Sequence, residues 1–226
     1  MRYSIVKITG VVLVLGCLSV YAMASETEKE AGWVSLFNGK NLDGWEQING
    51  TANYEAKDGC IVGMTAKGSP NSFLCTKKHY SDFELEFEVK VDDRLNSGVQ
   101  IRSNSFKEYR DGRVHGYQVE IAADGNSGLI YDEARRDKWV GEDKSDKKAS
   151  TAAFKKGDWN KYRVVCAGNS IKTWINGTPI ADIVDSMTAK GFIGLQVHSF
   201  SGDTPAQVCW RNLRIKELKP AGAAEK

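Results

Sequence analysis

Two neighbouring stretches of this sequence carry amide, guanidinium and carboxylate side chains at every second position. The segment GVQIRS contains Gln100 and Arg102, and the segment GYQVEIA contains Gln118 and Glu120. Successive side chains of a β-strand point to opposite faces of the sheet, so these four residues share one face if the two strands pair. Planar amides and a guanidinium–carboxylate pair are groups that hydrogen-bond sugar hydroxyls. We therefore expect a polar surface that recognises a carbohydrate.

A third segment, GLQVH, repeats the pattern with Gln196 and His198. Glu120 is the first candidate for an acid or base, because Arg102 on the neighbouring strand would hold its charge. The same Arg–Glu pair has a purely structural interpretation, and the sequence leaves both open. His198 is a second candidate for proton transfer, since a third strand here carries polar side chains on the same face.

Two long polar segments, 103–113 and 133–156, interrupt the apolar pattern. Long loops in a compact domain are often functional. The second is rich in charge around Trp139, and we interpret it either as a solvated excursion or as a lid in which Trp139 stacks on a sugar. Tyr131, Asp132 and Glu133 stand where a strand meets this segment, which is either a place for ligand contacts or an ordinary strand end. Tyr131 and Asp132 are the candidate substrate contacts.

A β-sheet is needed to position these side chains, and the apolar pattern predicts one. The segment Asp82–Val91 alternates apolar and charged residues throughout, which is typical of a half-buried strand. Similar segments follow at sandwich spacing, and Asn176-Gly177 favours a type I′ hairpin. We predict an all-β fold, a two-sheet antiparallel β-sandwich, with a single helical turn near 182–189. The expected core contains Phe83, Leu85, Phe87, Val99, Ile101, Val119, Ile121 and Leu195.

Short motifs spread along the chain together resemble the 3-keto-disaccharide hydrolase domain family, a sandwich of the concanavalin A-like (laminin-G-like) type. They are Phe37–Trp45, Tyr80–Leu85, Asn96–Arg102, His115–Glu120, Trp159–Tyr162, Trp174–Gly177, Gly194–His198 and Arg211–Leu218. The resemblance covers about Gly32 to Leu218 and implies a jelly roll. It includes His115, which is therefore a catalytic candidate. His115 is an even number of positions from Tyr117, so its side chain would lie on the same sheet face as Tyr117 unless a bulge turns it to the other face.

The resemblance implies cleavage of glycosides, 3-keto-disaccharides among them, whose sugar ring is oxidised at carbon 3. Such a ketone acidifies the proton on carbon 2, so a modest base can remove it while a donor or cation polarises the ketone. Elimination releases the aglycone, and addition of water gives net hydrolysis. In this interpretation Glu120 or a histidine is the base and Arg102 polarises the enolate oxygen. The amides that orient hydroxyls are Gln100, Gln118 and Gln196.

A divalent metal ion is an alternative to Arg102 in the polarising role, with His115, Glu120 and His198 as candidate ligands. The sequence leaves this cofactor open. The second class of function is a non-catalytic carbohydrate-binding module, because one fold serves many functions. A binding module would carry more exposed aromatic residues and fewer ionisable groups, so arginine, glutamate and histidine on one face favour an enzyme. In either class the expected partner is a carbohydrate.

The N-terminus has the features of a targeting segment. A basic start and an apolar stretch at 8–20 precede the small-x-small pattern Ala22-Met23-Ala24, so we predict a signal peptide at 1–24. A lipoprotein cut before Cys17 is the alternative, and it is the only one that attaches the protein to a membrane. We expect an exported protein, periplasmic or extracellular, or anchored through lipid.

Charge and length limit the remaining possibilities. Without Arg2 and Lys7 of the predicted signal peptide, the chain has equal numbers of basic and acidic residues. Such a chain lacks the basic surface that nucleic acids require, so we expect no nucleic-acid partner. The length suits one sandwich domain at 32–218, between polar tails at 25–31 and 219–226.

Four cysteines fall within the predicted domain: Cys60, Cys75, Cys166 and Cys209. Cys60 and Cys75 lie on strands joined by a short turn, so a cross-strand disulfide between them is geometrically possible. The alternative is that all four are small buried apolar residues.

Overall fold

The computed structural model describes residues 32–219, and strands make up most of its regular structure. The strands are β1 (Trp33–Ser35), β2 (Trp45–Ile48), β3 (Asn53–Lys57), β4 (Cys60–Met64), β5 (Ser72–Thr76), β6 (Phe83–Val91), β7 (Ser97–Asn104), β8 (His115–Ile121), β9 (Ile130–Glu133), β10 (Asn160–Ala167), β11 (Ser170–Ile175), β12 (Thr178–Val184), β13 (Phe192–Val197) and β14 (Gln207–Glu217). Two short helices are η1 (Glu142–Lys144) and α2 (Lys147–Ala153).

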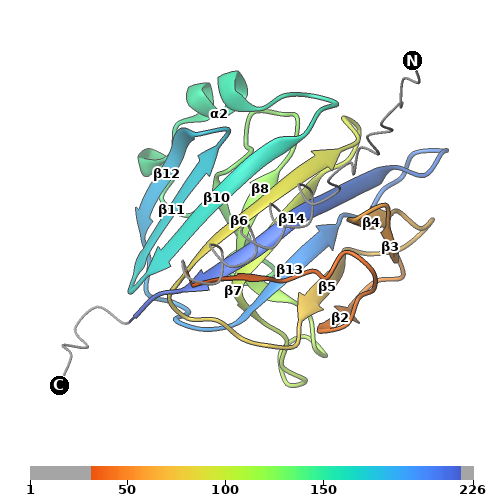
Figure 1. Cartoon of the computed structure of the whole chain (residues 1–226), viewed down its shortest axis with the longest axis horizontal. Coiled ribbons are helices and arrows are strands. Elements are labelled where there is room, and N and C mark those ends of the chain that lie inside the picture. The colour runs from red at the N-terminus through yellow and green to blue at the C-terminus, as the bar shows by residue number, and fades with distance from the viewer. Residues whose placement is uncertain (1–31, 220–226) are drawn as a thin grey trace, which may run out of the picture. The chain divides into compact units, whose positions relative to one another are not determined.

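The strands form two antiparallel sheets. In the first sheet they run in the order β12-β11-β10-β6-β14-β4-β3, and in the second in the order β2-β5-β13-β7-β8-β9. Figure 1 shows the sheets as two layers, with β10, β6 and β14 in front of β13, β7 and β8. The predicted all-β sandwich of the concanavalin A-like, jelly-roll type is confirmed.

The core lies between the two layers and follows from the alternation of apolar residues. Each strand turns every second side chain inward, and burying these residues together is the main stabilising term of such a fold. All eight predicted core residues are at most 1 % exposed: Phe83, Leu85, Phe87, Val99, Ile101, Val119, Ile121 and Leu195.

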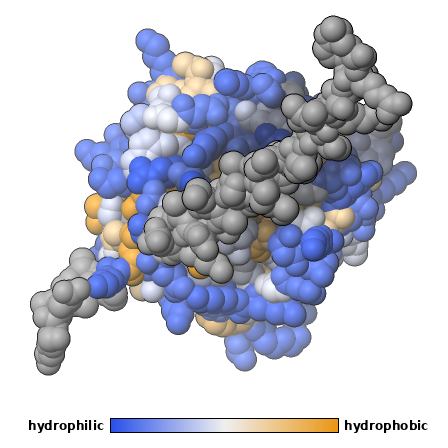
Figure 2. Space-filling model, viewed as in Figure 1, coloured by the Kyte–Doolittle hydropathy of each residue, from blue (hydrophilic) through white to orange (hydrophobic). Residues whose placement is uncertain are grey.

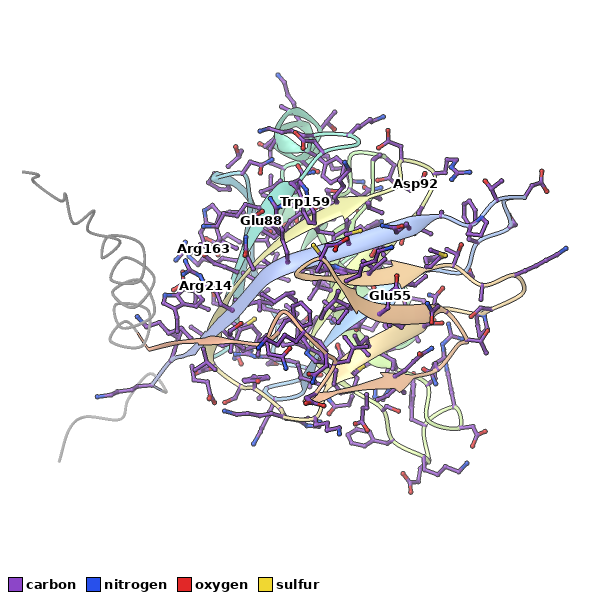
Figure 3. All side chains as sticks on the ribbon, turned by 45° about the vertical axis from the view of Figure 1, so that its right-hand side comes forward. Glu55, Glu88, Asp92, Trp159, Arg163 and Arg214 are labelled. Carbon is purple, nitrogen blue, oxygen red and sulfur yellow. The ribbon has the colours of Figure 1, made fainter. Side chains whose placement is uncertain are left out.

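The outer face of the first sheet is charged. Glutamates on the central strand β6 face arginines and a lysine on its two neighbours, β10 and β14 (Figure 3). The ion pairs are Arg163–Glu84, Lys161–Glu86, Arg214–Glu86 and Arg211–Glu88. Hydrophilic residues predominate on the visible part of this face (Figure 2). The charges compensate one another, and this face does not carry the polar residues singled out from the sequence.

The predicted hairpin at Asn176-Gly177 is confirmed, because both residues have positive φ, 50° and 85°. The predicted helical turn near 182–189 is wrong, since β12 continues to Val184. The helix α2 lies instead within 133–156. The Asp146 side chain caps it by accepting a hydrogen bond from the Ala149 N–H at 2.8 Å. A capping residue of this kind marks the start of a helix even where the sequence has no helical repeat of apolar residues.

Segment 133–156 is not simply a solvated excursion. Within α2, the buried Ser150 donates a hydrogen bond of 2.7 Å to the carbonyl of Ser127. The backbone N–H of Asp146 donates to the carbonyl of Ile180 on β12 at 2.8 Å. The second half of the segment is therefore fixed to the edge of the first sheet, and only its beginning reaches the polar face.

Several sequence predictions concern residues 1–31 and 220–226, which lie outside the described residues. They include the signal peptide, the alternative cut at Cys17 and most of the polar tails. Within residues 32–219, no helix is both long and apolar enough to span a bilayer. All four cysteines of the described region are free, so the disulfide considered between Cys60 and Cys75 is not formed.

Candidate functional site

The polar face predicted from the alternation lies on the second sheet, on the side turned away from the core. Gln100 on β7 is directly opposite Gln118 on β8. Gly98 on β7 is opposite Glu120 on one side and Gln196 on the other. All four polar side chains are almost completely buried, so amides and a carboxylate share a region that water barely reaches.

A directed chain of hydrogen bonds ends on Glu120. The hydroxyl of Ser103 donates to Gln100 Oε1 at 2.7 Å, and Gln100 Nε2 donates to Gln118 Oε1 at 2.7 Å. Gln118 Nε2 then donates to Glu120 Oε2 at 3.0 Å. Asn96 Nδ2 donates to the other oxygen, Oε1. Both carboxylate oxygens are therefore held by neutral amides.

Burial raises the pKa of Glu120 from 4.5 to about 7. Loss of hydration penalises the charged form. The hydrogen bonds from Gln118 and Asn96 act in the opposite direction and compensate only in part. A carboxyl group with this pKa changes protonation near neutral pH, which suits a general base.

Glu120 opens into a polar cavity of about 330 Å³. The lining residues are Asn71, Asn96, Arg113, Gln118, Glu120, Tyr131, Glu133, Asp137, Trp139 and His198. Five of the predicted site residues are among them: Glu120, Gln118, Tyr131, Trp139 and His198. Gln100 lies behind the cavity in the hydrogen-bond chain. Gln196 is buried on the same face, and neither of its side-chain polar atoms has a hydrogen-bond partner among the described residues.

Two aromatic rings form one wall of this cavity. Tyr131 and Trp139 pack edge to face with their ring centroids 5.2 Å apart, and their backbones form an isolated β-bridge. An aromatic surface next to amides and carboxylates is a common arrangement for sugar binding, because one sugar face is apolar and its edge is polar. The sequence interpretation of Trp139 as a stacking platform remains a prediction.

A second carboxylate, Glu133, lies in the same cavity. Asn71 Nδ2 donates to Glu133 Oε1 at 3.3 Å, and a guanidinium nitrogen of Arg113 (Nη2) is 3.8 Å from the same oxygen. Burial raises the pKa of Glu133, although Asn71 and Arg113 oppose this shift. His198 follows β13 directly, and Asn71 Oδ1 accepts a hydrogen bond from the next residue, Ser199, at 3.0 Å.

The predicted position of Arg102 is wrong, because its side chain does not face Glu120. Its φ of 48° and a shift in register place a bulge in β7, which turns the side chain away from the polar face. The buried guanidinium forms a 2.8 Å ion pair with Asp82 and donates to the carbonyls of Ser81 and Gly168 at 2.5 and 2.7 Å. Arg102 therefore fixes the end of the sandwich.

Asp132 also lies outside the cavity. Its side chain points to the opposite face from Tyr131 and is completely buried. It accepts a hydrogen bond of 2.8 Å from Arg135 Nε and another from Arg136 Nε. These contacts hold the turn that leads to Trp139.

His115 lies outside the cavity as well and packs in the 104–114 loop. Its ring centroid is 4.1 Å from that of Tyr109, and Nδ1 donates to the Arg113 carbonyl at 2.8 Å. The structure thus does not bring together the three candidate metal ligands, His115, Glu120 and His198. Within residues 32–219, no group of three or more His, Cys, Asp or Glu side chains is arranged to hold a metal ion.

Glu133, at the strand end that the sequence singled out together with Tyr131 and Asp132, also lines this cavity. Four further lining residues were not predicted from the sequence: Asn71, Asn96, Arg113 and Asp137. They lie in turns and loops, where no periodicity indicates the direction of a side chain.

Comparison with solved structures finds the same sandwich fold in several other proteins. A candidate glycosyl hydrolase from Parabacteroides distasonis is 21 % identical, with a TM-score of 0.62, and the match covers 86 % of this chain and 97 % of that one. A carbohydrate-binding module from Bacillus subtilis is 17 % identical, with a TM-score of 0.57 and coverage of 79 % and 98 %. A β-glucanase from Bacillus licheniformis is 14 % identical, with a TM-score of 0.55 and coverage of 82 % and 97 %.

At these identities the likeness concerns the fold alone. No curated protein matches the chain in sequence. The model of one family, however, matches residues 32–216, which is nearly the whole described region. The chain therefore belongs to the family of 3-keto-alpha-glucoside-1,2-lyase-like domains, the 3-keto-disaccharide hydrolase family that its motifs resemble.

Proposed function

We propose that this protein cleaves 3-keto-glycosides, 3-keto-disaccharides among them, by elimination followed by hydration, with Glu120 as the base. The observation that carries the proposal is a carboxyl group buried at a polar cavity and held by neutral amides, with a pKa of about 7. At neutral pH such a group can both accept and return a proton. Membership of the family supports the choice of a 3-keto substrate.

In the elimination, Glu120 takes the proton from carbon 2, and the electrons of that C–H bond form an enolate with the ketone at carbon 3. The bond from carbon 1 to the aglycone oxygen then breaks, a double bond forms between carbons 1 and 2, and the ketone is restored. The departing oxygen takes up a proton. In the hydration, water gives its oxygen to carbon 1, and Glu120 returns a proton to carbon 2.

Other cavity residues have roles that follow from their chemistry. Arg113 supplies the guanidinium group that lines the cavity, so it takes the polarising role that was predicted for Arg102 from the sequence. His198 gives a proton to the departing oxygen and regains one from the attacking water. Tyr131 and Trp139 hold the apolar face of the sugar ring.

The test compares a 3-keto-glucoside with its unoxidised parent. We expect aglycone release from the 3-keto compound alone, and Glu120→Gln should lower kcat/KM by at least about 100-fold. Glu88→Gln is the matched control, because Glu88 lies on the outer face of the other sheet, paired with Arg211.

Two results would contradict the proposal. Release from both compounds would indicate an ordinary glycosidase that uses the carboxylates Glu120 and Glu133. Release from neither, with sugar binding retained, would indicate a non-catalytic carbohydrate-binding module.

We also propose that the protein is exported, on the strength of the targeting pattern at 1–24. Mass spectrometry of the protein from its native host should find the chain starting at Ser25, or at a lipid-modified Cys17. A chain that retains Met1 would contradict both.

A further inference from the structure

A second cavity adjoins the one that contains Glu120. It has a volume of about 490 Å³, and three residues line both cavities: Asn71, Arg113 and His198. A ligand that fills the Glu120 cavity therefore lies next to whatever occupies the second one. His198 stands at the boundary between the two.

The two cavities differ in charge. Glu120, Glu133 and Asp137 line the first. The second is lined by Arg110 and Arg113 as well as His198, and its lining residues, all within the described region, include no aspartate or glutamate. A ligand group in the second cavity thus meets two guanidinium groups, whose carboxylate neighbours line the first cavity.

These arginines are placed by a well-fixed loop. Asn49 donates to the Gly112 carbonyl at 3.2 Å and accepts from the Val114 N–H at 2.7 Å. The Tyr109 hydroxyl donates to the carbonyl of Ala134 at 2.8 Å. These three bonds tie the loop to neighbouring segments on both sides of the arginines.

The guanidinium groups keep donors for a ligand. Arg110 Nη1 is 3.7 Å from Asp137 Oδ2, and Arg113 Nη2 is 3.8 Å from Glu133 Oε1. Both ion pairs are longer than a hydrogen bond, so these two nitrogens can still donate to a ligand. Planar guanidinium groups bind carboxylates through paired hydrogen bonds.

We propose that the second cavity is the subsite for the leaving group, and that it selects aglycones bearing a carboxylate. The inference rests on the proposed function, because it places the oxidised sugar beside Glu120 and the scissile bond beside His198. Phe73 and Pro70 in the same cavity provide apolar contact for the carbon skeleton of the aglycone. An aryl carboxylate and a uronate both have the required chemistry.

The test measures binding of the leaving groups alone, so that it does not depend on cleavage. NMR titrations of the full chain at pH 7 would use 4-hydroxybenzoate against 4-hydroxybenzamide, and glucuronate against glucose. We expect the carboxylate of at least one pair to bind roughly tenfold more tightly than its neutral partner, with shifts at Asn49 and Gly50. The pair in which the carboxylate binds more tightly shows whether the aglycone is an aryl carboxylate or a uronate.

Arg110→Gln should abolish the preference, because Arg110 lines only the second cavity. Lys107→Gln is the control, since it removes a charge from the same loop at a side chain that is 81 % exposed. Equal affinity within both pairs, no binding at all, or an equal loss in the two variants would overturn the proposal. If the preference appears but no 3-keto-glucoside is cleaved, the proposed reaction fails and the carboxylate site stands.

Discussion

Gly98 and Gln118 have complementary shapes: a Cβ atom added to Gly98 would lie 2.5 Å from Cδ of Gln118. The missing side chain on β7 leaves the space in which the amide of Gln118 crosses the sheet face to reach Gln100 and Glu120. Gly98 therefore helps to hold the Glu120 carboxylate in place, because it leaves room for the amide that donates to it.

We predict that Gly98→Ala displaces Gln118 and shifts the pH profile of cleavage to higher pH. Loss of the Gln118 hydrogen bond removes an interaction that lowers the pKa of Glu120, so a higher pH is needed to ionise the base. Overpacking should also cost about 1 to 3 kcal/mol of stability. Gly63→Ala, whose Cβ would meet Val197 in the core at the same 2.5 Å, should lose stability without a shift in the profile.

Glu120→Gln should change how stability depends on pH. The folded protein raises the pKa of Glu120 from 4.5 to about 7, so between these values the folded state binds more protons than the unfolded state. Wild-type stability therefore falls as pH rises through this range, and the glutamine variant lacks this contribution. Urea unfolding should show the variant gaining about 2 to 3 kcal/mol relative to wild type between pH 5 and pH 8. A constant difference would mean that Glu120 is not buried as described.

Arg102→Met should destabilise the protein by about 3 kcal/mol, because it leaves Asp82 without its buried partner and removes donors from two carbonyls. Chemical denaturation measures this directly. Arg94→Met is the matched control, since it breaks an exposed pair with Asp92 and should leave the stability almost unchanged. A fully stable Arg102→Met protein that no longer binds sugar would instead support a role in the site.

Trp139→Ala should weaken sugar binding by about tenfold, which corresponds to loss of one aromatic contact. Trp159→Ala is the comparison, because Trp159 stacks 3.9 Å from the Arg211 guanidinium on the outer face of the first sheet (Figure 3). Calorimetric titration with the sugar should show weaker binding for Trp139→Ala and unchanged binding for Trp159→Ala. Equal effects would mean that Trp139 acts on stability and not on the ligand.

The alternation of residues was sufficient to predict the sandwich, its core and the shared face of Gln100, Gln118, Glu120 and Gln196, because a slip of one residue would expose the core and bury charge. The prediction failed at Arg102, where a bulge breaks the period. Such a bulge depends on contacts distant in sequence, here Asp82 and Gly168. The same holds for Asn71 and Arg113, which loops bring to the cavity.

The hydrogen-bond chain from Ser103 to Glu120 also gives proton movement a direction. Gln118 and Asn96 both present hydrogens to the Glu120 oxygens, so the groups behind the carboxylate offer it donors and not acceptors. In the proposed reaction, a proton that Glu120 takes from the substrate therefore has its exit on the cavity side. It can return to the sugar or pass to the water that follows, because the groups behind the carboxylate already donate to it.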